Sequence, residues 1–253
     1  MEETKFKIRM VAADGNWLKG VINTGQIAQE LFLVVDQEKM VIANLDPNHI
    51  QFYRLEIYPV DCPEYGCSEP VKTLIDSEEL IKVFKRWRAG YDIIFTDTGD
   101  YSLKIIFDNH KGVTKEFSIK YIEANYDQPQ EPPLDLNNKA GINIKDFKES
   151  LGDLESITDK FTIAIPDEDN ILLSAEAEHG DLKINLPATH YQAPEKARSI
   201  MSLKAIKDSV RFLHNKSQLI LEVGTNTPLI TRTELGRDSF MHIYTAPRIE
   251  VEE

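Results

Sequence analysis

The chain of 253 residues contains no run of about 18 apolar residues, the length that a membrane-spanning helix needs. Its opening residues, MEETKFKIRM, are charged where a secretory signal peptide would be apolar. We therefore expect an intracellular protein without a membrane anchor.

Cysteine is scarce, with only Cys62 and Cys67 in the segment DCPEYGCSEP. Their spacing is too wide for a CxxC redox motif, and the second pair that a zinc site would need is missing. We predict that both cysteines lie in a turn. Whether they form a disulfide stays open, because some thermophiles keep disulfides inside the cell.

The signatures of nucleotide-binding and hydrolytic enzymes are missing as well. The sequence has no GxxxxGKS/T, GxGxxG, GxSxG or HExxH motif, and its six histidines lack metal-ligand spacing. Asp167-Glu168-Asp169-Asn170 lacks the central Gly and closing Glu of a calcium loop, so we predict a hairpin turn there. We expect no catalytic residues, metal or cofactor. The enzyme alternative is a hydrolase that uses dispersed carboxylates, as glycosidases do.

Negative charge predominates, with 42 Asp and Glu against 29 Lys and Arg and a net charge of −13. Against this background, two predicted amphipathic helices, over residues 77–89 and 201–214, carry positive charge on their polar faces. The two stripes are Lys82, Lys85 and Arg86 in the first helix, and Lys204, Lys207 and Arg211 in the second. One such stripe can be merely a solvated face. Its repetition in an acidic chain favours a surface that binds a polyanion.

A proline-rich segment divides the chain. Residues 123–135 read EANYDQPQEPPLD, a composition that neither a helix interior nor a central strand accepts. We interpret this segment as an extended, semi-rigid linker between two domains, residues 1–122 and residues 136–253.

The same order of elements is predicted on each side of the linker. A short helix, over residues 14–24 or 145–157, is followed by alternating strands, the basic helix and two further strands. Strands joined so closely exclude βαβ crossovers, so the sheets should be antiparallel. The predicted class is α+β, with two similar domains that each carry two helices on a common side.

Two short segments resemble a known family. LDPNHI at residues 45–50 matches an Asp-x-x-His followed by an aliphatic residue, and IYTAPRIE at residues 243–250 matches a Tyr-x-Ala-Pro-Lys/Arg ending. Together with the duplication, the length and the linker, they make the chain similar to the proliferating cell nuclear antigen (PCNA) family of DNA sliding clamps. The ending looks more archaeal than eukaryotic. An archaeal member would be cytoplasmic and nucleoid-associated, and a eukaryotic one nuclear.

The resemblance implies a trimeric, pseudo-sixfold ring whose helices surround duplex DNA and which makes DNA polymerase processive. Sequence-independent sliding needs many Lys and Arg contacts to phosphates and no base-reading groups. Glu149, Gly152 and Ser156 stand where relatives often carry basic or His residues, which weakens the expectation for their helix. The DNA-facing residues implied are Lys19, Lys82, Lys85, Arg86, Lys148, Lys204, Lys207 and Arg211.

The resemblance also implies a pocket that binds short aromatic-anchored peptides of DNA polymerase, the clamp loader, flap nuclease and ligase. An extended linker leaves main-chain groups free for an incoming strand, and neighbouring apolar side chains can form an anchoring cavity. The preferred peptide stays open. The residues implied are Leu45, Phe52, Tyr126, Gln128, Pro129, Pro228, Tyr244, Ala246 and Pro247.

Ring closure implies that an edge strand near residues 113–121 pairs with one near residues 181–186 of the next subunit. The contact would be head-to-tail, between identical chains or between paralogues of a heterotrimeric or checkpoint-type clamp. The interface residues implied are Val113, Lys115, Phe117, Ile119, Leu182, Ile184 and Leu186.

Overall fold

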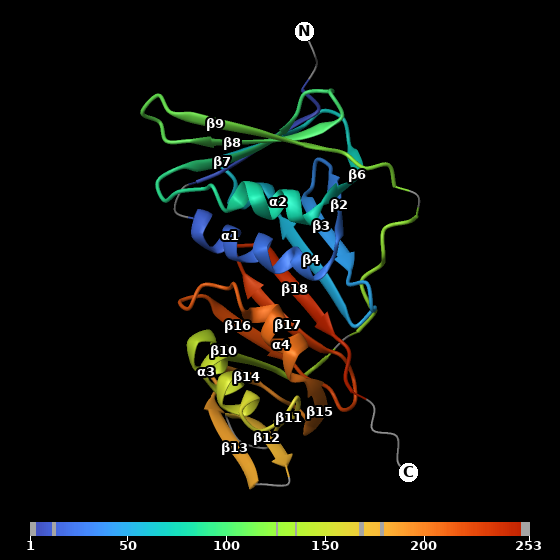
Figure 1. The fold of residues 1–253 in the computed structure, drawn as a ribbon, viewed down its shortest axis with the longest axis vertical. Helices are drawn as coiled ribbons and strands as arrows, with labels where there is room; N and C mark the ends of the chain where they lie inside the picture. Colours follow the sequence, from blue (N-terminus) through green and yellow to red (C-terminus); the bar gives the residue numbers. More distant parts are fainter. Residues whose placement is uncertain are drawn as a thin grey trace. The chain divides into compact units, whose positions relative to one another are not determined.

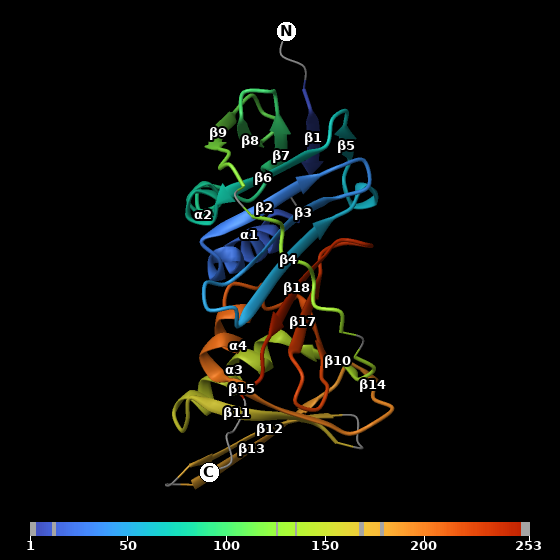
Figure 2. The same cartoon turned by 90° about the vertical axis from the view of Figure 1, so that its right-hand side faces the viewer.

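The computed structural model describes residues 4–11, 14–124, 126–134, 136–166, 170–177 and 180–248. Residues 167–169 of the turn predicted at 167–170, and the final residues of the ending, 249–250, lie outside this range. The chain divides into two compact units, which are described separately (Figures 1 and 2). The first unit comprises Met1–Pro47, Tyr53–Gln130 and Glu234–Met241, and the second comprises Asn48–Phe52, Glu131–Thr233 and His242–Glu253. The domain boundaries inferred from the linker stay a prediction.

Within the described part of the first unit, the strands lie in the orders β5-β1-β7-β8-β9 and β6-β2-β3-β4. Every register recorded between these strands is antiparallel. The strands are β1 (Phe6–Met10), β2 (Glu30–Val35), β3 (Met40–Leu45), β4 (Gln51–Ile57), β5 (Glu64–Cys67), β6 (Val71–Asp76), β7 (Asp92–Asp97), β8 (Ser102–Asp108) and β9 (Thr114–Lys120).

Two helices pack against each other in this unit, α1 (Gly15–Thr24) and α2 (Ser77–Phe84), and α2 also contacts β6 and β9 (Figure 1). Short 3-10 turns follow α1 at Gly25–Ile27 and β4 at Pro59–Asp61. The Asp76 carboxylate caps α2 by accepting a hydrogen bond from the Glu79 main-chain N at 2.8 Å. The buried face of α2 ends in Phe84, whose ring lies 6.1 Å from Phe95 in β7.

Helix α2 is shorter than the sequence predicted, and the expected end at residue 89 is wrong. The apolar period of the sequence continues past Phe84 because Trp87 is also buried. Trp87 nevertheless lies after the end of the helix, where its indole N donates to the main-chain O of Tyr91 at 2.9 Å. Lys85 caps the helix C-terminus and Arg86 follows it. Lys85 and Arg86 of the basic stripe therefore lie just beyond the helix and continue its basic face.

In the second unit, the described strands lie in the orders β14-β10-β16-β17-β18 and β13-β12-β11-β15. The recorded registers are again antiparallel. The strands are β10 (Lys139–Asn143), β11 (Lys160–Ile165), β12 (Asn170–Ala177), β13 (Gly180–Pro187), β14 (His190–Gln192), β15 (Ala197–Ser202), β16 (Gln218–Glu222), β17 (Leu229–Glu234) and β18 (Phe240–Thr245).

The second unit also holds a pair of packed helices, α3 (Ile144–Glu155) and α4 (Leu203–Val210). The Asn143 side chain caps α3 by accepting hydrogen bonds from the main-chain N atoms of Lys145 and Asp146. The predicted span of 201–214 is wrong at both ends. The helix starts at Leu203, directly after β15, and ends at Val210. Leu213 is buried although it lies in the turn after the helix.

The predicted class is confirmed: the fold is α+β with antiparallel sheets, and the described residues place two α-helices in each unit. The sequence reading missed β1, β5, β6, β10, β14, β15 and β18. It was also wrong to place Cys67 in a turn, because this residue ends β5, and both cysteines are free thiols. Burial raises the pKa of the Cys62 thiol to about 12, so it stays protonated near neutral pH.

Candidate nucleic-acid interface and partner-binding residues

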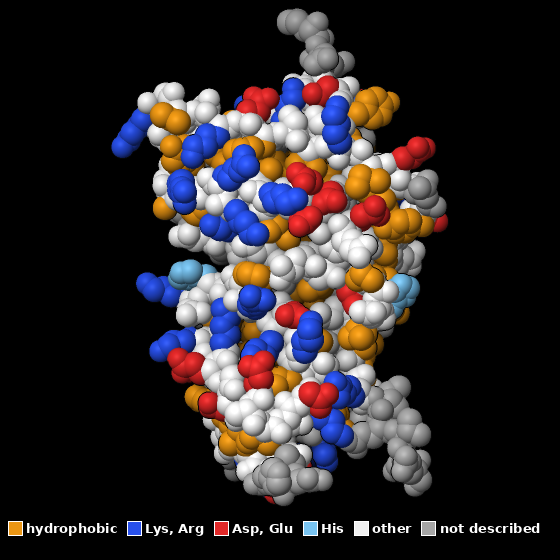
Figure 3. Space-filling model, viewed as in Figure 1, with side chains coloured by type: hydrophobic (Ala, Val, Ile, Leu, Met, Phe, Trp, Pro, Cys, Tyr) orange, Lys and Arg blue, Asp and Glu red, His pale blue; other side chains and the backbone are white. Residues whose placement is uncertain are grey.

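The helical face of the first unit carries a compact group of cations. Lys82, Lys85 and Arg86 are exposed and Lys19 in α1 is half-buried. Lys82 pairs with Glu79 at 2.9 Å and Glu78 at 3.4 Å, and the hydrogen bond to Glu79 raises its pKa. Figure 3 shows the Lys and Arg side chains gathered over these helices, with Asp and Glu toward one side. The acidic residues occupy the first turn of α2, and the cations extend beyond its C-terminal end, as the helix dipole favours.

Lys19 and Lys85 differ from Lys82 in their surroundings. No Asp or Glu carboxylate in the described part of the chain lies within ion-pair distance of either amine. These two cations therefore keep their full charge available to an external anion.

Arg86 is held by an aromatic ring. Its guanidinium lies over Phe117 of β9, 5.6 Å from the ring centroid, an arrangement that attracts the cation to the ring face. The structure thus brings together one residue predicted to face DNA and one predicted to lie at the subunit interface.

In the second unit, the predicted cations lie around one groove of about 800 Å³ between α3 and α4. Lys204 pairs with Asp208 at 2.6 Å, and Lys207 pairs with Glu155 of the facing helix. Figure 3 shows acidic and basic side chains interspersed over these helices. The groove residues of interest are Lys148, Lys204, Lys207 and Arg211, together with Glu155 and Asp208.

Lys148 points toward its own chain. Its amine donates to the main-chain O of Leu213 at 2.6 Å and to Oδ1 of Asn215 at 3.2 Å, and burial lowers its pKa. Arg211 is exposed and its guanidinium lies over the neighbouring Phe212 ring, 5.1 Å from the centroid. The basic residues of the second unit are therefore more strongly engaged within the protein than those of the first.

The residues predicted to form the peptide pocket belong to both units, and each set is described within its own unit. In the first unit, the ring of Tyr126 packs edge-on against Phe32, with centroids 5.2 Å apart, and the side chain is 48% exposed. Its hydroxyl accepts from Nδ2 of Asn44 at 3.2 Å and donates to Glu30 at 3.3 Å. Of the other members in this unit, Leu45, Gln128 and Pro129 are half-buried.

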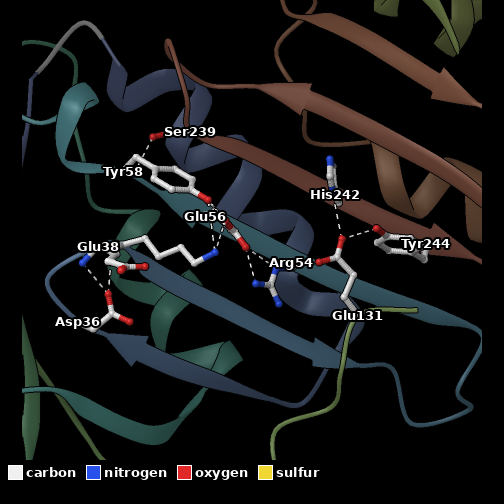
Figure 4. A network of polar contacts seen from close by, with 10 residues as sticks. Asp36, Glu38, Arg54, Glu56, Tyr58, Glu131, Ser239, His242 and Tyr244 are labelled. Carbon is white, nitrogen blue, oxygen red and sulfur yellow. Dashed lines mark hydrogen bonds and ion pairs between the residues drawn. The ribbon is translucent and has the colours of Figure 1, made fainter. Parts of the chain in front are cut away.

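In the second unit, the Phe52 and Tyr244 rings lie 5.9 Å apart, and both are buried. The Tyr244 hydroxyl donates to the Glu131 carboxylate, which also lies 3.4 Å from Nδ1 of His242 (Figure 4). The main-chain N of Ala246 donates to the O of Ile50 at 2.8 Å. The two remaining members of the predicted set, Pro228 and Pro247, are half-buried.

The sequence reading missed Glu131, which stands in the linker between Gln130 and Pro132. Figure 4 also shows a second carboxylate network, in the first unit, where buried Glu56 accepts from Lys39, Arg54 and Tyr58. No local pattern singles out Glu131, because its partners His242 and Tyr244 lie more than 100 residues further along the chain. Glu56 takes two of its partners, Arg54 and Tyr58, from residues two positions away.

The two strands predicted to form the subunit interface lie at the edges of their sheets, β9 in the order β5-β1-β7-β8-β9 and β13 in the order β13-β12-β11-β15. The predicted residues of β9 and β13 occupy alternate positions and are buried or half-buried. Phe117 packs on Phe107 with ring centroids 5.5 Å apart, and Val113, just before β9, is 46% exposed.

The hydrogen bonds at the two ends of β9 fix the direction of its main-chain groups. Tyr121 N donates to Tyr101 O, and Asn109 N donates to Val113 O, so odd-numbered residues of β9 pair with β8. Because direction alternates along a strand, the main-chain groups of Glu116 and Ser118 point to the open edge.

Solved structures with the same fold define the class of protein. A crystal structure of PCNA from Thermococcus kodakaraensis superposes with a TM-score of 0.87 at 18% identity and covers 96% of this chain and 100% of that one. The PCNA of A. fulgidus, solved with the C-terminal region of FEN-1 bound, gives a TM-score of 0.82 at 19% identity, with 98% and 100% covered. The fold is that of the PCNA-type clamps.

Sequence relatives give the family. The DNA polymerase sliding clamp of Methanothermobacter thermautotrophicus is 32% identical over 229 residues, which cover 90% of this chain and 91% of the relative. That of Methanobrevibacter smithii is 29% identical over 230 residues, with 90% and 91% covered. No protein-family model matches the chain. The chain belongs to the family of DNA polymerase sliding clamps, so the resemblance read from LDPNHI and the Tyr-x-Ala-Pro-Arg ending is confirmed.

These relatives are named for clamping, in agreement with the expectation of a protein that is not an enzyme. Among the residues that the structure describes, no helix is long and apolar enough to cross a membrane, and no His, Cys, Asp and Glu side chains form a group of three or more that could hold a metal ion.

Proposed function

We propose that this chain assembles into a trimeric ring that encircles duplex DNA, makes DNA polymerase processive and binds replication and repair proteins. The observation that carries the proposal is the basic face over α1 and α2 in a chain whose net charge is −13. In an acidic protein, such a face attracts a polyanion locally while the remaining surface repels it. A ring then retains the DNA by topology, and its contacts can stay weak enough for sliding.

The chemistry of this face suits the DNA backbone. Lys and Arg bind phosphates without reading bases, which is what a clamp that moves along any sequence requires. In our proposal the group Lys19, Lys82, Lys85 and Arg86 makes the stronger contribution. Lys82 is paired with Glu78 and Glu79, but Lys19 and Lys85 have no carboxylate partner among the described residues. The groove cations of the second unit contribute less, because Lys204 and Lys207 are paired with carboxylates and Lys148 donates to its own chain.

Retention on DNA tests the topological part of the proposal. Once loaded by a cognate clamp loader, the protein should stay on nicked circular plasmid through gel filtration and should be lost when one cut makes the plasmid linear. Equal retention on circular and linear DNA would contradict an encircling ring. The mass of the pure chain in solution separates the assemblies, because a homotrimer has three times the 28.9 kDa of one chain, whereas a subunit of a heterotrimer stays monomeric.

Partner binding is proposed to use the linker and the segment that follows β18. A. fulgidus PCNA was solved with the C-terminal region of FEN-1 bound, and the present chain shares its fold. Tyr126 and Leu45 would contact the peptide from the first unit, and Phe52, Tyr244, Ala246 and Pro247 from the second. Apolar side chains beside free main-chain groups are the usual elements of a site for an aromatic-anchored peptide. Polymerase, clamp loader, flap nuclease and ligase are the partners expected to carry such peptides.

Tyr244→Ala should weaken binding of an aromatic-anchored peptide by about tenfold or more, the effect of losing about 1.4 kcal/mol of contact. The C-terminal peptide of A. fulgidus FEN-1 is a suitable probe, and isothermal titration calorimetry measures its affinity. Tyr244→Phe is the matched control, because it keeps the ring beside Phe52 and removes only the hydroxyl that donates to Glu131. If the alanine variant melts like the wild type and binds the peptide equally well, Tyr244 is not part of the pocket.

A further inference from the structure

Strand β6 has an outer edge that the linker covers only in part. It ends the order β4-β3-β2-β6, and on its outer side Leu74 exchanges two main-chain hydrogen bonds with Ile122, of 3.3 and 2.9 Å. Figure 1 shows β6 beside the start of the linker. Among the described residues, no main-chain bond continues this pairing past Ile122. The edge is therefore open at the residues that precede Leu74.

The main chain of Lys72 points to this open edge. Leu74 directs both its N–H and its C=O toward Ile122, and the direction alternates from one residue to the next along a strand. Thr73 therefore faces its register partner Leu33 in β2, and Lys72 faces away from β2. One donor and one acceptor of β6 are thus available to another strand.

These groups border a cavity of about 670 Å³ that lies wholly within the first unit. Its walls come from the start of β6, the residue before β1, the β7–β8 turn and the first residues of the linker. Val71 and Ile122 give it an apolar side. Tyr101, which is 81% exposed and has a positive φ of 55°, stands at its rim.

The charges around the cavity favour an acidic ligand on the side of β6. Lys72 is exposed without a carboxylate partner among the described residues, and Lys5 lies 3.6 Å from the exposed Glu69. Asp97, 2% exposed, already accepts bonds from the Tyr121 hydroxyl at 2.8 Å and from Gly99 N at 2.6 Å. Glu123, on the linker side, is exposed to solvent, where its charge is screened.

We propose that this edge binds an extended segment of a partner protein by strand addition. The segment pairs with the N–H and C=O of Lys72, places a carboxylate side chain between Lys5 and Lys72, and rests an apolar side chain against Tyr101 and Ile122. Main-chain pairing supplies the affinity and the alternate side chains supply the specificity. The site differs in all its residues from the pocket proposed above, and its test needs neither DNA nor polymerase, so either proposal can fail alone.

Lys72→Pro tests the site, because proline removes an outward-facing N–H and is tolerated on edge strands. The probe is a capped, fluorescein-labelled peptide in which valine and threonine alternate around a central glutamate, and fluorescence anisotropy gives its affinity. The wild type should bind this peptide, and Lys72→Pro should weaken binding by about tenfold or more. Lys72→Ala keeps the N–H and loses only an exposed charge, so its effect should be about threefold.

Three results would overturn the proposal. The first is equal affinity of the wild type for the peptide and for a version N-methylated at alternate amides, which cannot pair with an edge. This comparison uses the wild type alone and decides the question even if Lys72→Pro does not fold. The second is tighter binding of the same peptide with a central lysine. The third is slow amide hydrogen exchange at Lys72 in the free protein, which would show that the chain itself covers this edge.

Discussion

Replacing Lys82 and Lys85 by glutamate is expected to shorten DNA synthesis on a long primed template to the length reached without the clamp, while the assembly keeps its mass. Both side chains are exposed at the C-terminal end of α2, and the reversal places negative charge where we propose that phosphates pass. Log affinity falls with log salt concentration, and each lost phosphate contact should make this slope less negative by about 0.9. Product lengths on a denaturing gel and DNA binding across a salt series measure the two effects.

The matched control is Lys7→Glu with Lys111→Glu. Both residues are exposed in the first unit outside α1 and α2, and the change in net charge is the same. The control should support synthesis at the wild-type length. An equal loss in both variants would mean that net charge alone matters, and normal synthesis by the Lys82 and Lys85 variant would remove the DNA-facing assignment.

The second large effect is expected from Ser118→Pro in β9. Ser118 is exposed and its main-chain groups point away from β8, so proline deletes an edge donor without breaking a bond inside the sheet. If β9 pairs with β13 of the next subunit, the trimer should dissociate to chains of 28.9 kDa at micromolar concentration. Sedimentation velocity reports the mass.

Ser118→Ala provides the control, since it keeps the N–H and removes only the hydroxyl, and it should stay trimeric. Circular dichroism shows whether the proline variant retains its fold as a monomer. A folded proline variant with the mass of the wild type would exclude β9 from the interface.

Most of the architecture could be predicted because each half repeats the same local signals. The short apolar runs of β2, β3 and β7 and the period-2 alternation of β8, β11 and β12 were readable as strands, and the amphipathic stripes marked four helices. The ends of α2 and α4 were not readable. Trp87 and Leu213 lie beyond the helix ends, but they are buried and stand at positions that continue the helical period. Apolar spacing alone therefore extends each predicted helix too far.

Two of the missed strands, β5 and β14, give a weak local signal, whereas β1 and β15 do alternate in burial. β14 has three residues, and β5 has four half-exposed or exposed residues next to the cysteines. Such strands form because a neighbouring strand supplies hydrogen bonds, as β1 does for β5, and a single segment does not reveal its neighbour.

Partners that come from distant parts of the chain explain the rest. A helical pattern places Lys148 on the polar face of α3, but it cannot show that Leu213 O lies within 2.6 Å of the amine. Likewise the linker sequence gives no sign that Glu131 accepts from Tyr244. Local periodicity determines the face on which a side chain lies, and tertiary folding determines which group it meets.

The position of Arg86 over Phe117 links two events that are otherwise separate. On the proposed assembly, a neighbouring subunit covers β9 and removes water from around the Phe117 ring, and a desolvated ring holds a cation more firmly than a wet one. Closing the oligomer would then immobilise a guanidinium near the central channel. Oligomerisation and affinity for the double helix would be thermodynamically coupled through one aromatic side chain, and each would strengthen the other by the same factor.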